Sequence, residues 1–211
     1  RPEHRVRVLA VAAHVAVLAI EAGDGELARR AVAADGRPGF WSSLAHGLLC
    51  LNHGIRGFIG KDARDSAEAE RLGRRAVELA PEPLSRGLAW FWLGQARVLL
   101  DDLDRAADAL ERGSLEAVPG GDMSVVSLAL LAGVRHLRGE HEAALAAATE
   151  VVNRAQSYRQ SGLWAWEVYA SLPYALELGH HGRHAEALDF VRELLEDNAV
   201  PETPGVMTSV V

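Results

Sequence analysis

The sequence predicts an all-α fold made of consecutive helical hairpins. Apolar residues, chiefly Ala and Leu, recur at helical spacing along almost all of the 211 residues. No segment shows the sustained alternation of apolar and polar residues that a half-buried strand needs. Short clusters rich in Gly and Pro interrupt the pattern and alternate between tight turns and looser connections. They are "GDG" at 23–25, "DGRPG" at 35–39, "APEP" at 80–83, "VPGG" at 118–121, "RGE" at 138–140, "GHHGR" at 179–183 and "VPETPG" at 200–205.

Five hairpins fit between these breaks, within a single domain that spans residues 1–211. Thr203 followed by Pro204 is typical of a helix start, so we expect a sixth hairpin to begin there. Because the chain starts at Arg1 rather than Met and its last helix would stop after about two turns, we expect a piece of a longer protein. The expected hairpins cover residues 3–36, 40–80, 84–117, 122–157 and 161–198, and the truncated helix starts at 203.

An Ala occupies nearly the same place in the second helix of every predicted hairpin. In four hairpins a turn residue precedes this Ala by five positions, at Gly23, Asp101, Gly139 and Gly182. The steps from one Ala to the next are 41, 37, 38 and 43 residues, a period typical of helical-repeat arrays. A small residue is needed there because a larger side chain would push apart two closely crossing helices. The residues are Ala28, Ala69, Ala106, Ala144 and Ala187.

The third hairpin carries the most specific pattern, "WFWLGQARVLLDDLDRAADAL" at residues 90–110. This segment resembles the tetratricopeptide repeat (TPR), whose pattern is W-x2-L-G-x2-Y followed by Ala and a large apolar residue. Arg97 stands where that pattern has an aromatic residue. The matching positions are Trp90, Leu93, Gly94, Ala106 and Leu110.

The second hairpin matches the later half of the TPR pattern at Ala69, Ala76 and Pro81. Its earlier half fits two registers, one around Trp41 and one around Gly57. The resemblance implies a right-handed α-solenoid of about five TPR-like hairpins with the start of a sixth. The long period and the Ala-, Arg- and Leu-rich composition also resemble the helical-repeat region of large bacterial LuxR-type, ATP-binding transcription regulators.

These resemblances imply a non-enzymatic regulatory domain of a bacterial transcription regulator. Such a domain binds a protein, peptide or small effector and passes a change of solenoid conformation to flanking modules of the same longer chain. Two alternatives stay open. One is a TPR-type scaffold that binds a partner peptide or helix without a role in transcription, and the other is an accessory domain of an enzyme.

The TPR resemblance also implies where a partner binds, because the first helix of each TPR hairpin lines a concave face. Residues beside the Trp and Gly positions are exposed on that face. These mostly apolar residues either form a binding groove or are buried as core, if irregular repeats tighten the superhelix. In this chain the concave positions are Leu88, Phe91, Gln95, His136, Trp166, Tyr169, Leu172 and Leu176.

The fifth hairpin has two further features. Trp164 and Trp166 lie on different sides of a predicted helix, so at least one of them faces more than its partner helix. Pro173 lies inside the same helix, frees the carbonyl of Tyr169 and predicts a kink. The kink either shapes a pocket beside the Trp side chains or bends the helix around its neighbour.

Patterns for metal or phosphate binding are incomplete, so we expect neither a cofactor nor a metal ion. "GIRGFIGKD" at 54–62 departs twice from the phosphate-binding loop G-x4-G-K-[ST]. "HHGRH" at 180–184 has three His residues, but Gly182 interrupts a common helix face. A polar turn is the favoured interpretation there, as it is for the turn flanked by His136 and His141.

Composition excludes other classes of function. The net charge of −7 and the absence of a clustered Lys/Arg face argue against direct contact with nucleic acid. The single cysteine, Cys50, lies in the apolar run "LLCL" without an electropositive setting, and no G-x-S-x-G occurs, so we expect no catalytic nucleophile. A lone Cys is typical of a cytoplasmic protein. The stretch at 8–20 is too short to span a membrane.

Overall fold

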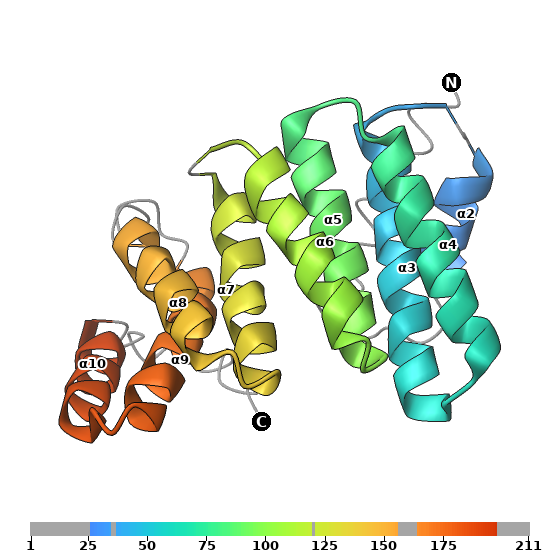
Figure 1. Ribbon diagram of the computed structural model, residues 1–211. Coiled ribbons are helices and arrows are strands. Elements are labelled where there is room, and N and C mark those ends of the chain that lie inside the picture. Colours follow the sequence, from blue (N-terminus) through green and yellow to red (C-terminus); the bar gives the residue numbers. More distant parts are fainter. Residues whose placement is uncertain (1–25, 35–36, 120, 156–163, 198–211) are drawn as a thin grey trace, which may run out of the picture.

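The computed structural model describes residues 26–34, 37–119, 121–155 and 164–197 (Figure 1). Within these ranges every regular element is a helix, which confirms the all-α prediction. The predicted hairpin 3–36 is described only in its second helix, and the helix expected from 203 lies outside the described residues. The helices are α2 Glu26–Ala34, α3 Phe40–Gly60, α4 Ala63–Leu79, α5 Pro83–Leu99, α6 Leu103–Glu116, α7 Asp122–Leu137, α8 His141–Ala155, α9 Trp164–His180 and α10 His184–Asp197.

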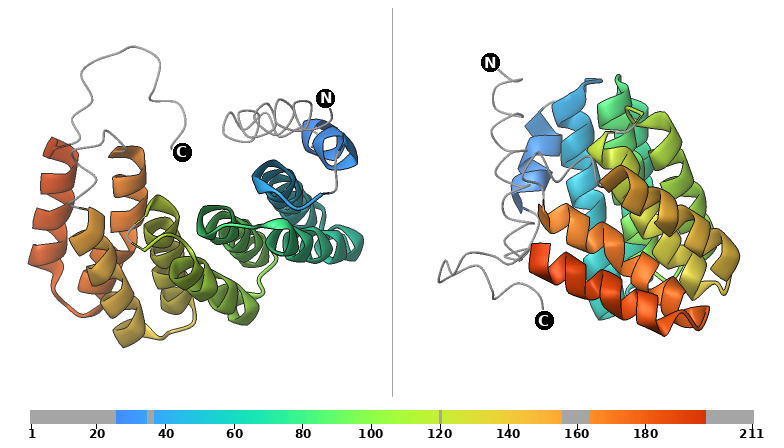
Figure 2. Two further views of the ribbon diagram at one scale, coloured as in Figure 1. Left: turned by 90° about the horizontal axis from the view of Figure 1, so that it is seen from above. Right: turned by 90° about the vertical axis from the view of Figure 1, so that its left-hand side faces the viewer.

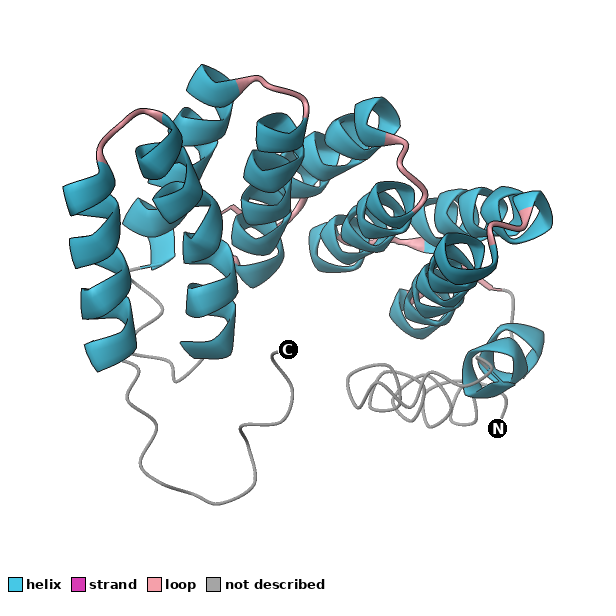
Figure 3. Ribbon diagram, turned by 90° about the horizontal axis from the view of Figure 1, so that it is seen from below, coloured by secondary structure: helices cyan, strands magenta, loops and turns pink. Residues whose placement is uncertain are grey.

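Consecutive helices pack against each other along the whole described chain. In addition, α3 contacts α5, α5 contacts α7, and α7 contacts α9, whereas α4, α6, α8 and α10 make no comparable contacts among themselves. The odd-numbered helices therefore form one layer and the even-numbered helices the other, as the left panel of Figure 2 shows. The row of helices curves towards the side lined by α3, α5, α7 and α9 (Figure 3), which we call the inner side.

Small residues lie where the two helices of a hairpin cross. Ala69, Ala106 and Ala144 are at most 1% exposed, whereas the equivalent Ala187 is only half-buried. A Cβ atom on Gly94 would lie 2.6 Å from Cγ of Leu110, closer than two carbon atoms can approach. Gly94 thus permits the close crossing of α5 and α6.

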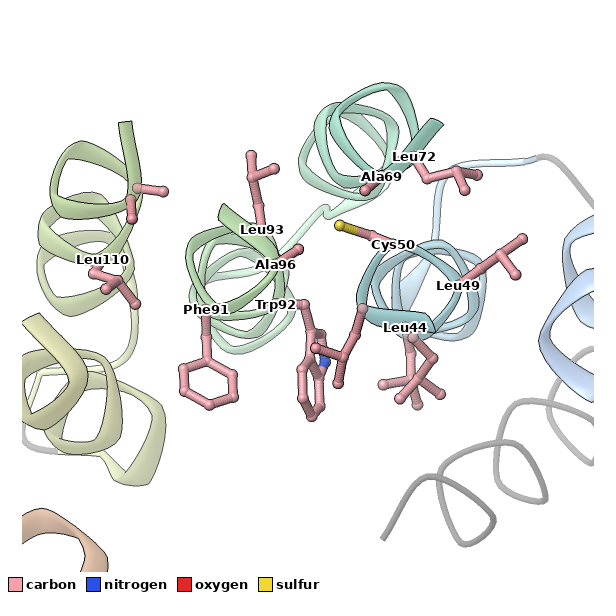
Figure 4. Close-up of a cluster of buried hydrophobic side chains, with 14 of the residues drawn as sticks. Leu44, Leu49, Cys50, Ala69, Leu72, Phe91, Trp92, Leu93, Ala96 and Leu110 are labelled. Carbon is pink, nitrogen blue, oxygen red and sulfur yellow. The ribbon is translucent and has the colours of Figure 1, made fainter. Parts of the chain in front are cut away.

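A continuous apolar core lies between the hairpin of α3 and α4 and the hairpin of α5 and α6. Figure 4 shows Cys50 of α3 and Leu93 of α5 with Ala69 and Leu72 of α4 among the buried side chains. Cys50 is fully buried, and this burial raises the pKa of its thiol to about 12. Of the other residues matched to the TPR pattern, Ala76 is fully buried, Trp90 is half-buried, and Pro81 is exposed in the link between α4 and α5.

Local signals in the sequence account for the helix ends. Asp102 precedes α6 and its side chain accepts a hydrogen bond from the backbone N–H of Arg105, which caps the helix. Gly139 and Gly182 follow α7 and α9 with φ of 75° and 73°, a left-handed conformation that favours glycine. α9 continues through Pro173 to His180, so the proline does not end this helix.

A part-buried ion pair joins the hairpin of α3 and α4 to the hairpin of α5 and α6. The guanidinium of Arg97 donates two hydrogen bonds to the carboxylate of Glu70, of 2.9 and 2.7 Å, and a third of 2.8 Å to the backbone carbonyl of Arg105. Burial alone would raise the pKa of Glu70, but hydrogen bonds from Arg97 and Arg74 outweigh it and lower the pKa to about 2. Arg97 therefore replaces the aromatic residue of the TPR pattern with a polar link between α4, α5 and α6.

Candidate functional site

The predicted concave positions of α5 lie in the core or at its edge. Phe91 is 3% exposed, and its ring packs against that of Trp92 with centroids 5.0 Å apart. Leu88 and Gln95 are half-buried, and Leu88 packs against the same core. Phe91 therefore fits the core alternative that the sequence left open, since so little of its side chain reaches the surface.

The predicted positions of α9 include two exposed leucines. Leu172 and Leu176 are 51% and 56% exposed, and they lie one turn apart on the same face of the helix. Tyr174, on the opposite face, packs against alanines of α7 and α8 and against the ring of Phe190 on α10. Leu172 and Leu176 thus point away from the helices that hold α9 in place. The side chains of Trp164, Trp166 and Tyr169 lie outside the described residues.

Three helix ends bring a cluster of histidines around one buried carboxylate. Glu177, in the last turn of α9, is 0% exposed. Its Oε1 accepts a hydrogen bond of 2.6 Å from Nδ1 of His136, in the last turn of α7. Its Oε2 lies 3.4 Å from Nδ1 of His141, the first residue of α8, and 3.9 Å from Nε2 of His181. We call Glu177, His136, His141 and His181 the His–Glu cluster.

Several polar atoms of the His–Glu cluster are buried without a hydrogen-bond partner. They are Oε2 of Glu177, Nδ1 of His141 and Nε2 of His181. The ring of His180 stacks on that of His141, with centroids 3.4 Å apart and planes inclined by 19°. The three histidines keep about a quarter to a third of their side-chain surface exposed, but Nδ1 of His141 and Nε2 of His181 are themselves buried.

The His–Glu cluster is the group of described residues best suited to hold a metal ion. One nitrogen each from His136 and His141 and one oxygen from Glu177 all lie within 4.8 Å of one another. The sequence alone favours two separate polar turns, at His136–His141 and at His180–His184. His136 and Glu177 are 41 residues apart, which is about one period of the predicted repeat.

A second polar site is formed by arginines of α4, α5 and α6. A cavity of about 220 Å³ between α4, α5 and α6 is lined by four arginines and Trp90. Each arginine already has a partner: Arg74 and Arg97 bind Glu70, Arg105 binds Asp102, and Arg112 lies 5.2 Å from the centre of the Trp90 ring. These arginines therefore stabilise the fold through their existing partners and are not free to bind an anionic ligand.

Comparison with known proteins found no match: no family model fits the chain, and no curated protein or solved structure matches it. None of the described helices is long and apolar enough to cross a membrane.

Proposed function

We propose that this chain is a binding domain without catalytic activity, which captures an amphipathic helix of a partner protein or peptide on its inner side. In this proposal the hairpins form a right-handed, TPR-like α-solenoid. The curvature of the row and the layering of odd- and even-numbered helices support this arrangement. The only cysteine, fully buried with a raised pKa, is a poor nucleophile, which also favours binding over catalysis.

The observation that carries the proposal is the exposed pair Leu172 and Leu176 on α9. A single exposed leucine is common on protein surfaces and needs no explanation. Two of them at spacing i, i+4 lie on α9, a helix that lines the inner side. They face away from α7, α8 and α10 and form an apolar strip. Such a strip matches the anchor residues of an amphipathic helix, which also repeat at i, i+3 and i+4.

The same proposal extends to regulation. A partner or small effector that prefers one curvature of the hairpin row would shift the population towards it. Flanking modules of a longer chain would sense that shift, as expected for the regulatory segment of a LuxR-type transcription regulator. This extension is supported by the resemblance of the repeats and composition alone, whereas the binding proposal is also supported by the exposed leucines.

A selection of displayed amphipathic helices tests the binding proposal. We expect the chain to enrich helices with apolar residues at i, i+3 or i+4 spacing. Each leucine is about half exposed, so covering it contributes about 1 kcal/mol to binding. The double variant Leu172→Ser, Leu176→Ser should therefore bind the selected helix about 30-fold more weakly.

The matched control is Leu188→Ser, Leu195→Ser on α10, whose leucines are 64% and 65% exposed. This variant should bind the selected helix as well as the wild type. Both double variants should keep the wild-type Tm, since the altered side chains are exposed. Equal loss of affinity in the two variants, or no enrichment of any helix, would contradict the proposal.

A further inference from the structure

We propose that the His–Glu cluster binds a zinc ion, with Glu177, His136 and His141 as ligands and a water molecule in the fourth position. The ion would join the hairpin of α7 and α8 to the hairpin of α9 and α10. This inference does not depend on the proposed function, because it concerns different residues and a different ligand.

The spacing of the donor atoms suits a tetrahedral zinc site. Zinc bonds to nitrogen and carboxylate oxygen of 2.0–2.2 Å place neighbouring ligand atoms about 3.4 Å apart. Nδ1 of His141 is 3.4 Å from Oε2 of Glu177. Nδ1 of His136 is 2.6 Å from Oε1, a hydrogen-bond distance, so its ring would move away from the carboxylate to reach the same separation. The proton on Nδ1 then moves to Nε2, so that the neutral ring offers its lone pair.

The types of donor atom select the metal. Two imidazole nitrogens with one carboxylate oxygen are typical ligands of zinc and its transition-metal neighbours. Calcium and magnesium need six or more oxygen donors, which this cluster does not supply. His180, stacked on His141, orients that ring towards the carboxylate.

The electrostatics of Glu177 also favour a cation. A fully buried carboxylate is costly unless it is paired and its oxygens accept hydrogen bonds. Glu70 meets this requirement through Arg97 and Arg74. In the described part of the chain, the charge partners of Glu177 are histidines only, and its Oε2 accepts no hydrogen bond. A zinc ion would supply the missing positive charge and use the unpartnered nitrogen of His141.

The location gives the ion a mechanical role. His136 ends α7, His141 begins α8, and Glu177 lies in the last turn of α9. One ion would therefore fix three helix ends that belong to two neighbouring hairpins. Zinc would hold α9 at a set angle to α7, and thereby stiffen the connection between the two hairpins.

The test uses the tag-free chain after removal of metal with a chelator. Titration with zinc sulfate against a chromophoric zinc indicator should show one ion bound per chain. Zinc at about a hundred times its Kd should raise Tm by about 5–10 °C. Cobalt(II) used in place of zinc should give the intense visible absorption of a tetrahedral site. Calcium should neither bind nor change Tm.

His141→Asn tests the assignment of ligands, and it should lower the affinity for zinc at least about a hundredfold. The matched control is His53→Asn, because His53 is also half-buried and lies 2.6 Å from a carboxylate, that of Asp65. The control should bind zinc as the wild type does. Absence of stoichiometric zinc binding by the wild type, or equal loss of affinity in both variants, would overturn the proposal. Should His141→Asn not fold, the stoichiometry, Tm shift and cobalt spectrum of the wild type still decide the question.

Discussion

Replacement of Arg97 by Met should destabilise the chain by about 2–3 kcal/mol. Arg97 is 9% exposed and donates two charge-assisted hydrogen bonds to Glu70 and one to the carbonyl of Arg105. Removal of one partner of a buried ion pair costs about 3–5 kcal/mol, because the other charge stays buried. Glu70 keeps 23% of its side chain exposed and retains its contact with Arg74, so the lower part of that range, or slightly less, applies.

Urea unfolding followed by far-UV circular dichroism measures this effect. The midpoint should fall while the slope m stays constant, since the variant exposes the same surface on unfolding. For a chain of 211 residues, Tm should fall by about 5–10 °C. The matched control is Arg74→Met, which removes the 2.6 Å contact of a 64% exposed arginine with the same carboxylate. That control should cost less than about 1 kcal/mol. Equal losses in the two variants would refute the reasoning that burial makes the Arg97 contact strong.

Two further predictions follow from Glu70 and from the glycines. The pKa of Glu70 is lowered to about 2 in the folded chain, so its contribution is present above its unfolded pKa and is lost as pH falls from about 4.5 to 2. An acid titration of stability should therefore be flatter in Glu70→Gln than in the wild type over that window, and identical slopes would contradict the prediction. Gly94→Ala should destabilise by about 1 kcal/mol, because the new Cβ would lie 2.6 Å from Cγ of Leu110. The control is Gly133→Ala, whose Cβ would meet nothing within 4 Å and which should instead stabilise α7 by up to about 1 kcal/mol. If both substitutions changed stability in the same direction, the result would argue against the close crossing of α5 and α6.

The features that could be predicted from the sequence are those that depend on local pattern. Helical spacing of apolar residues and the Gly and Pro breaks predicted an all-helical chain. Asp102 caps α6, as a short acidic side chain just before a helix predicts. The buried alanines Ala69, Ala106 and Ala144 show why a small residue recurs with the repeat, since each lies where helices pack closely. Ala187 is less buried because fewer described helices surround α10, which packs against α9.

The features that could not be predicted depend on contacts between distant residues. Arg97 departs from the TPR pattern, and only the structure shows that Glu70, 27 residues away, is its partner. Phe91 and Leu172 belong to the same predicted face, yet one is core and the other is exposed, because the number of neighbouring helices differs along the row. The His–Glu cluster required the end of α7 to lie beside the end of α9. The sequence feature that points to this contact is the separation of 41 residues between His136 and Glu177, which is about one predicted repeat period.

Amide hydrogen exchange, measured with and without the selected amphipathic helix, locates the surface at which the chain binds that helix. If the inner side binds the helix, exchange should slow in residues 171–180 of α9 and in the adjoining residues of α7. Exchange in α4, which lies in the other layer, should stay unchanged. Protection confined to α4, α6 or α10, with α9 unaffected, would contradict the claim that this chain binds its partner on the inner side.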